Sequence, residues 1–279
     1  MKEEVVTEIV TEHRQVSITR ACRVMQLHKS RYYYVSRKDG SDQEVMDAIR
    51  RASEFGDGFW NIYHRIRKDH KWNHKRLYRV YKMMHYNRRS KLRKRLSTRV
   101  KTPLSLPTEP CLCWSIDFVS DALTCGRRFR VLNIIDDFNR EAVAMDAAMS
   151  ITSSRLIRML EVAIWEYGKP RKIRSDNGPE FISKEFEQWC RANEIDHQFT
   201  QPGCPTQNAY IERFNGSYRR GVLDAYMFRN LTEVRDITEK WRQDYNNDRP
   251  HTALGNKTPT QVKYEYQSSI TLPDANVAI

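Results

Sequence analysis

The 279-residue sequence has no long apolar run, and its mean hydropathy is -0.76, which excludes a membrane-spanning helix. It does not open with a charged segment followed by an apolar one, so we expect no secretory signal. None of the six cysteines forms a C-x-x-C pair, and His70 and His74, at helical spacing, have no cysteine pair beside them. We interpret these two histidines as a solvated helix face. These absences predict a cytoplasmic protein with reduced thiols, no zinc and no membrane partner.

Positive charge is abundant and unevenly distributed. Lys and Arg number 48 against 35 Asp and Glu, a net charge of +13. Residues 1–105 hold 26 basic and 11 acidic side chains, whereas the rest of the chain holds 22 and 24. The excess therefore lies in the N-terminal third and favours a polyanionic partner, of which double-stranded DNA is the simplest. A basic surface that only aids solubility is the alternative.

Helical periodicity dominates the first 40 residues. Residues 2–13 predict one short amphipathic helix, and residues 17–36 predict two more, with Ser17 and Ser30 as N-caps. Residues 1–40 thus have a helix-turn-helix outline, in which Arg31 near the start of the second helix is a candidate DNA contact. Many small helical bundles share this pattern.

A second basic helical region covers residues 41–101. It ends in the run RRSKLRKR, in which six of eight residues are basic. A phosphate-tracking arm is favoured over a solvated linker, because two basic helical groups precede it. The candidate DNA contacts here are Lys75, Arg76, Arg79, Arg88, Arg89, Lys91, Arg93, Lys94 and Arg95.

The pattern changes after the Pro-rich segment 102–110, which reads as a linker. Three hairpin-linked strands come first, and then helix, strand, helix, strand and helix. This order predicts an α/β domain over residues 111–226, with a mixed five-stranded sheet flanked by helices. Residues 227–279 are expected to add a C-terminal helix and a tail that pack on this core.

Three carboxylates stand out in the predicted domain. Asp117 lies inside the apolar strand WSIDF, where an acidic side chain needs solvent, a partner or a metal. Asp176 ends the strand KIRS, just before Asn177-Gly178, a signal for a tight turn. Glu212 lies on the polar face of the following helix, for which a solvated surface is the alternative. That face also carries Asn208, Asn215 and Arg219.

The spacing and surrounding motifs resemble a known family. The sequence has 58 residues between Asp117 and Asp176 and 35 between Asp176 and Glu212. The chain resembles the Asp-Asp-Glu retroviral integrase superfamily and, more closely, the second-frame, catalytic transposase protein of bacterial insertion sequences. The supporting motifs are WSIDF, LNIIDDFNR, RSDNGPEF, QPGCPTQNAYIERFNG and YNNDRPH. Each motif is weak alone, but their order is highly specific.

The resemblance implies a ribonuclease-H-like integrase catalytic core that uses two Mg²⁺ or Mn²⁺ ions. Asp117 would bridge both ions, and Asp176 and Glu212 would each hold one. It implies cleavage at the element's ends to free a 3′-hydroxyl, followed by strand transfer at the same site. Asp136 and Asp137 would support the turn after the second strand.

The resemblance also implies the partners. These are the element ends and target DNA, with Arg219 on a phosphate and Asn208, Asn215 and Asn177 as further DNA contacts. A homo-oligomer on DNA, a possible upstream-frame protein and a nucleoid-associated location in a bacterial cytoplasm follow as expectations. Two rival functions are a nuclease that cleaves without joining and a catalytically silent DNA-binding regulator.

Overall fold

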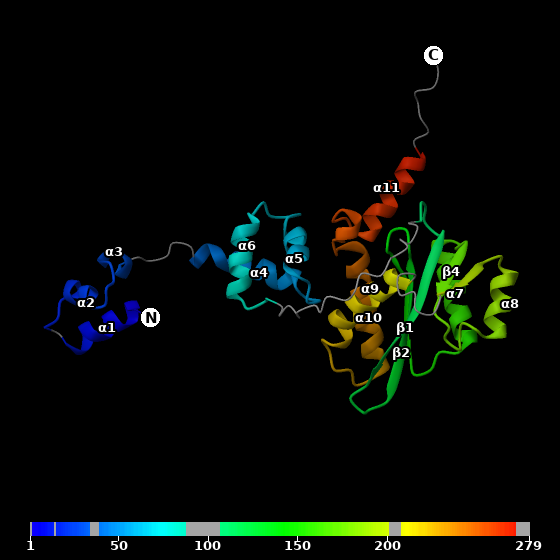
Figure 1. Cartoon of the computed structure of the whole chain (residues 1–279), viewed down its shortest axis with the longest axis horizontal. Helices are drawn as coiled ribbons and strands as arrows, with labels where there is room; N and C mark the ends of the chain where they lie inside the picture. The colour runs from blue at the N-terminus through cyan, green and yellow to red at the C-terminus, as the bar shows by residue number, and fades with distance from the viewer. Residues whose placement is uncertain (1, 14, 34–38, 88–106, 201–207, 272–279) are drawn as a thin grey trace, which may run out of the picture. The chain divides into compact units, whose positions relative to one another are not determined.

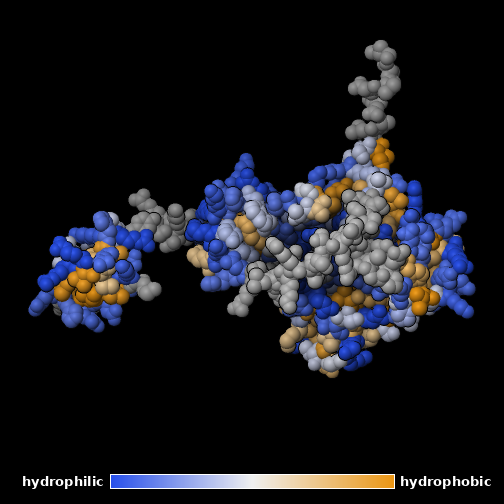
Figure 2. Space-filling view, in the orientation of Figure 1, coloured by the Kyte–Doolittle hydropathy of each residue, from blue (hydrophilic) through white to orange (hydrophobic). Residues whose placement is uncertain are grey.

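The computed structural model describes residues 2–13, 15–33, 39–87, 107–200 and 208–271. The chain forms two compact units, residues 1–48 and 49–279, and each is considered by itself. Figure 1 shows the helices and strands along the chain. In the described part of the chain, no helix is long and apolar enough to cross a membrane. The face shown in Figure 2 is mostly hydrophilic, with small apolar patches.

The first unit consists of α1 (Lys2–Glu12), α2 (Ile18–Val24), α3 (Lys29–Tyr32) and the start of α4 (Asp39–Ala52). Its small core contains Val6, Ala21 and Cys22. Ser17 caps α2, as predicted, because its side chain accepts a hydrogen bond from the amide of Arg20. The prediction for Ser30 was wrong. Helix α3 begins at Lys29, two residues before the start that a Ser30 cap would give. Its N-cap is His28, whose Nδ1 accepts a hydrogen bond from the Ser30 amide.

The second unit begins within α4 and continues with α5 (Phe59–Ile66) and α6 (His74–Met83). The expected helix face of His70 and His74 is not formed. Asn73 caps α6, so the helix starts at His74, and His70 lies before it with its ring stacked on Trp72 at a centroid distance of 4.1 Å. Helix α5 is tied to the rest of the unit by Arg65, which pairs with Asp57 at 2.8 Å and with Asp244.

Five strands form one mixed sheet, as the sequence predicts. They are β1 (Cys113–Ala122), β2 (Arg128–Asp136), β3 (Ala142–Ala148), β4 (Lys172–Ser175) and β5 (Asp196–Phe199). The order across the sheet is β3-β2-β1-β4-β5. The β1–β2 and β2–β3 pairs are antiparallel, whereas β1–β4 and β4–β5 are parallel. Strand β1 is therefore central, and its neighbour β4 runs in the same direction.

Helices cover both faces of this sheet (Figure 1). On one face α7 (Ser153–Tyr167) and α8 (Lys184–Ala192) pack on residues such as Leu132 and Ile134. On the other, α9 (Ala209–Tyr218) and α10 (Leu231–Asn247) pack on Val131 and Ile135. Because successive strand residues point to opposite faces, this alternation along β2 builds two separate cores. The confirmed fold is a three-layer α/β domain preceded by a helical region.

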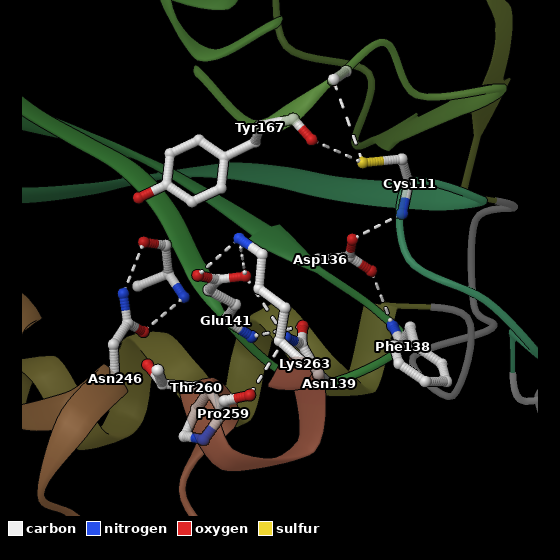
Figure 3. Close-up of polar contacts among 12 residues, drawn as sticks. Cys111, Asp136, Phe138, Asn139, Glu141, Tyr167, Asn246, Pro259, Thr260 and Lys263 are labelled. Atoms are coloured by element: carbon white, nitrogen blue, oxygen red, sulfur yellow. Dashed lines mark hydrogen bonds and ion pairs between the residues drawn. The ribbon is translucent and has the colours of Figure 1, made fainter. Parts of the chain in front are cut away.

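The turn between β2 and β3 is fastened from inside the protein (Figure 3). Asp136 accepts hydrogen bonds from the amides of Cys111 at 2.7 Å and Phe138 at 2.8 Å. Glu141 pairs with Lys263 of α11 (Pro259–Thr271) at 3.2 Å. Asn139 donates to the carbonyl of Pro259 at 3.2 Å. These contacts fix the turn and connect it to the last helix.

Candidate active site

Strand β1 places Asp117 beneath α9. Trp114 and Ile116 belong to the core under α7 and α8, whereas Val119 belongs to the core under α9 and α10. Asp117 has the same parity as Val119 and therefore shares its face. Directly across on β2, its register partner is Asn133. The acidic residue inside an apolar strand thus points toward the helix that carries Glu212.

Two hydrogen bonds hold the half-buried Asp117 carboxylate. Its Oδ1 accepts from the backbone amide of Phe118 at 2.7 Å, and its Oδ2 accepts from Nδ2 of Asn215 at 2.8 Å. Burial raises the pKa of Asp117 to about 6, and the negative charges of Asp176 and Glu212 act in the same direction. Asp176, from the end of β4, and Glu212, from α9, therefore both lie within electrostatic range of Asp117 on β1.

Asp176 is exposed at the end of β4 and shapes its own loop. Its Oδ1 accepts from the amide of Gly178 at 3.0 Å, which is a turn closed by an Asp side chain. The turn signal was correct in place but not in mechanism, because neither Asn177 nor Gly178 has a positive φ. Glycine avoids crowding here, because a Cβ on Gly178 would lie 3.1 Å from Oδ1 of Asp176 and 3.2 Å from Phe181, closer than most Cβ contacts.

Glu212 is exposed on the first turn of α9. The opposite face of this helix is fully packed, with Ile211, Phe214 and Tyr218 buried in the core. This apolar anchor fixes the rotation of α9 about its axis, so the direction in which Glu212 projects is set by core packing. The helical face predicted from the sequence is therefore present, and it faces Asp117.

The sequence missed one residue of this site, Asn133. It is fully buried, and its Nδ2 donates at 2.7 Å to Oδ1 of Asn215, which in turn donates to Asp117. Two amides thus connect β2, α9 and the carboxylate in one chain. The available signal was a lone polar residue inside the apolar strand VLNII, because a buried amide needs hydrogen-bond partners.

The four candidate DNA contacts near the triad are in different settings. Asn177 is exposed, whereas Asn208 is only 8% exposed and lies at the N-cap of α9. Asn215 is engaged with Asp117, as described above. Arg219 donates to the carbonyl of Ser120 on β1 at 2.9 Å. Of these four, Asn177 is therefore the one with an exposed side chain, and Arg219, at the end of α9, contacts the strand that carries Asp117.

Asp136 and Asp137, the nearest rivals of Asp117, are buried and serve the framework. Asp137 accepts from the hydroxyl of Ser115 at 2.7 Å and pairs with Arg174 at 3.0 Å. Asp136 closes the turn described above, and burial raises its pKa to about 6. The two carboxylates therefore connect β1, β2 and β4 beside the site, in agreement with the support role expected for them.

The candidate contacts of the helical regions are partly described. Lys75 and Arg79 are exposed on α6, and the guanidinium of Arg76 lies 5.8 Å from the ring centroid of Trp72. Arg31 pairs with Glu3 at 3.1 Å. The remaining predicted contacts lie outside the described residues; they are Arg88, Arg89, Lys91, Arg93, Lys94 and Arg95.

Comparison with known proteins places this site in a family. Residues 107–205 and residues 193–259 each match a family described as integrase core domain. A 31.7 kDa protein of insertion element IS407 from Burkholderia multivorans is 37% identical over 95% of this chain and 97% of its own length. The chain belongs to the integrase-core transposase family of insertion elements. The resemblance noted in the sequence is confirmed.

Other relatives of this integrase-core protein agree with the assignment. A 39.2 kDa protein of insertion element IS476 from Xanthomonas euvesicatoria is 33% identical over 92% of the chain and 75% of the relative. The transposase of insertion element IS629 from Shigella sonnei is 27% identical and matches 58% of the chain and 54% of the relative. The insertion-element relatives thus extend over both the helical region and the core.

Solved structures similar to this integrase-core protein include retroviral integrases. The HTLV-2 integrase catalytic core domain, solved in complex with magnesium, matches 56% of this chain and 98% of its own, with 21% identity and a TM-score of 0.44. A chain of the simian T-cell lymphotropic virus intasome, solved in complex with the PP2A regulatory subunit B56 gamma, matches 83% of this chain and 77% of its own, with 20% identity and a TM-score of 0.48.

Proposed function

We propose that this protein is a DNA transposase. It cuts at the ends of its insertion element to free a 3′-hydroxyl and then joins that hydroxyl to another phosphodiester at the same Asp-Asp-Glu site. The observation that supports the proposal is that Asp117, Asp176 and Glu212 are close enough for the last two to act electrostatically on the first. They come from three elements separated by 58 and 35 residues, yet the charges of the other two raise the pKa of Asp117.

The donor set fits hard divalent cations, Mg²⁺ or Mn²⁺. Carboxylate oxygens are the ligands these ions prefer, and the repulsion among three nearby carboxylates disappears when a cation binds. In the part of the chain that the structure describes, no three His, Cys, Asp or Glu side chains converge on one point. A two-ion site requires only two of the carboxylates at each ion. Asp117 would be shared, and Asp176 and Glu212 would each complete one ion.

Bound ions would supply activation of the attacking oxygen and stabilisation of the leaving oxygen. The chain's own residues supply position. Asn215 and Asn133 hold the Asp117 carboxylate, the Gly178 amide holds Asp176, and the packed face of α9 directs Glu212. Because the carboxylates are already held in position, only the reacting oxygens need to move, which favours in-line displacement at phosphorus.

The same geometry serves both steps. In the first, a water oxygen forms a bond to phosphorus at the element's end while the bond from phosphorus to the 3′-oxygen breaks and that oxygen takes a proton. In the second, the freed 3′-oxygen attacks another phosphodiester and displaces its 3′-oxygen, so the number of phosphodiester bonds is conserved. The basic helical regions, residues 1–40 and 41–101, are assigned to holding the DNA ends and the target.

The partners follow from this activity. We assign element ends and target DNA as the substrates, a homo-oligomer on DNA as the active form, and an upstream-frame protein as a further source of DNA-binding parts. Arg219 and Asn177, beside the triad, are assigned to the DNA strand in the site.

The test is substitution of each carboxylate by its amide. We expect Asp117→Asn, Asp176→Asn and Glu212→Gln each to abolish cleavage and strand transfer on an element-end duplex and to bind that duplex as tightly as the unaltered protein. Asp121→Asn, four residues along β1, is the matched control because the hydrogen bond that Asp121 accepts among the described residues comes from the Ala122 amide of its own strand. Mg²⁺ or Mn²⁺ should support activity and Ca²⁺ should not. Joining by any triad variant, or activity in a chelator, refutes the assignment.

A further inference from the structure

A hollow opens beside α9, and none of the three carboxylates lines it. Its volume is about 250 Å³, below the roughly 300–1,000 Å³ of pockets that enclose drug-sized ligands. Four parts of the chain line it: Asn61 of α5, α9 with the π-helical turn η2 (Arg219–Leu223), the β2–β3 turn, and the end of α10 with the residues after it. A hollow of this size suits a small group such as an ion or one phosphate.

Arginines dominate the lining. Arg140, Arg213, Arg220 and Arg249 all contribute to it, and no Asp or Glu of the described residues does. Tyr210, Ser217 and Thr252, which carry hydroxyl groups, also line the hollow; the Ser217 hydroxyl donates to the carbonyl of Arg213. Four cations around one small space repel one another, so an anion that enters it is stabilised by all four. We name this feature the arginine pocket.

The positive charge of the arginine pocket is only partly compensated. Arg249 pairs with Asp57 at 3.3 Å, and Arg140 donates to the carbonyl of Asp137. For Arg213, which is exposed, the described part of the chain provides no carboxylate within ion-pair distance. His251 adds no charge, because burial, together with the charges of the nearby Arg249 and Arg213, lowers its pKa to about 4. The pocket therefore presents net positive charge toward solvent.

The Arg140 side chain is held before any ligand arrives. Arg140 has a φ of 63°, a left-handed conformation that is uncommon outside glycine, in the turn that Asn139 and Glu141 fasten from inside (Figure 3). Its guanidinium lies 3.3 Å from the ring centroid of Tyr210, which restricts its plane. Preorganised guanidinium groups bind phosphate oxygens through two parallel N–H bonds with little loss of freedom.

The position of the pocket on α9 identifies the ligand. Arg213 directly follows Glu212, and each residue turns about 100° around a helix axis. The face of Glu212 and Asn215 therefore looks toward Asp117, while the adjacent face of Arg213, Ser217 and Arg220 looks into the pocket. We propose that the arginine pocket binds a phosphodiester of the same DNA whose neighbouring phosphodiester reacts at the triad. This inference rests on the proposed function.

The test measures DNA binding by the full chain carrying Arg213→Gln. Arg158→Gln is the matched control, because Arg158 is also exposed on a helix but lies on α7, over the opposite sheet face. Fluorescence anisotropy is recorded across a salt series on a duplex copied from the element's terminal repeat and on a random duplex. A third arm follows thermal unfolding with added inorganic phosphate.

We expect Arg213→Gln to weaken binding to the DNA about threefold and to reduce the salt slope by about 0.9, the effect of one lost phosphate contact. Arg213→Lys should retain the slope with weaker binding, and Arg158→Gln should match the unaltered protein. If Arg213→Gln weakens binding to both duplexes, the pocket binds a phosphodiester of DNA of any sequence. If it weakens binding to the terminal-repeat duplex alone, the pocket binds the element end.

Two outcomes overturn the proposal. Unchanged affinity and slope for Arg213→Gln on both duplexes would refute it while leaving the transposase function intact. Stabilisation by inorganic phosphate that Arg213→Gln abolishes, with DNA binding unchanged, would identify a site for free anions instead. If the unaltered protein binds neither duplex, the proposed function itself fails. The two proposals therefore fail in distinguishable ways.

Discussion

Asn215 could either contact DNA or position the Asp117 carboxylate, and its hydrogen bond to Asp117 allows these two roles to be tested against each other. The sequence placed Asn215 on the polar face of its helix as a DNA contact, whereas the structure joins its Nδ2 to Oδ2 of Asp117 at 2.8 Å. Asn215→Ala removes this bond and also leaves Nδ2 of the fully buried Asn133 without its acceptor. A positioning role predicts loss of turnover with DNA affinity preserved, and a contact role predicts the reverse.

The magnitude follows from the kind of bond that is lost. A hydrogen bond to a charged group contributes about 1.5–3 kcal/mol, and each 1.36 kcal/mol corresponds to about tenfold in rate. If the bond acts fully in the transition state, Asn215→Ala slows strand transfer roughly 10- to 150-fold. Because this bond lowers the pKa of Asp117, its loss also raises the Mg²⁺ concentration needed for half-maximal rate.

The assay is single-turnover strand transfer with the protein in excess over a pre-cleaved element end, alongside anisotropy on the same duplex. Asn133→Ala and the double variant complete a cycle. Since Asn133 reaches the carboxylate only through Asn215, the two losses should not add. Control variant Asn193→Ala changes an amide at the end of α8, which bonds to the Trp189 carbonyl. Weakened DNA binding at an unchanged single-turnover rate, or additive losses, would refute the positioning role.

Three other changes test the surrounding structure. Gly221→Ala should lower the free energy of unfolding by about 1–3 kcal/mol in urea titrations, because its Cβ would lie 2.7 Å from Nε1 of Trp241. The control is Gly126→Ala, where a Cβ meets nothing within 4 Å but φ is 82°, so that backbone strain is measured without crowding. The free energy of unfolding should fall by at most about 3 kcal/mol as pH drops from 6.5 toward 4, because His251 accepts a proton less readily in the folded protein than in the unfolded chain. The difference in this free energy between the unaltered protein and His251→Gln should shrink over the same pH range, and a constant difference would contradict the role of His251. Replacing the basic residues of 88–95 by Gln should weaken binding to all duplexes and flatten the salt dependence, and an unchanged slope would make that run a solvated linker.

The fold could be predicted because its signals are local. Alternating apolar residues define β1 to β3, and helical periodicity defines the packed faces of α7 to α10. Asp117 and Asp176 stand out because each interrupts or ends an apolar strand, and Glu212 because it shares a face with other polar residues. The sheet order, with β1 beside β4, then brings the first two carboxylates to adjacent parallel strands.

What the sequence did not predict depends on pairs of segments that only the fold brings together. Asn133 and Asn215 are 82 positions apart, and each alone resembles an ordinary polar residue. The cap of α3 was assigned to Ser30 because serine is the commoner cap, yet the backbone turn places the His28 ring at the free amide. The arginine pocket has the same origin, because Arg140 and Arg249 reach Arg213 from distant turns.

Helix α9 carries the apolar anchor, the catalytic candidate Glu212 and the pocket residue Arg213 on three different faces. Its apolar face is locked by aromatic contacts, with ring centroids 5.4 Å apart between Phe214 and Trp241 and 4.9 Å apart between Phe214 and Tyr245. That anchor sets the angle at which Glu212 faces Asp117 and at which Arg213 faces the proposed phosphate. A DNA strand held in the arginine pocket is then placed in fixed register with the carboxylates. Phe214→Leu, which loosens the anchor and changes no polar side chain, should therefore slow strand transfer and weaken DNA binding together in single-turnover and anisotropy assays. Loss of only one of these would show that the two faces are positioned independently.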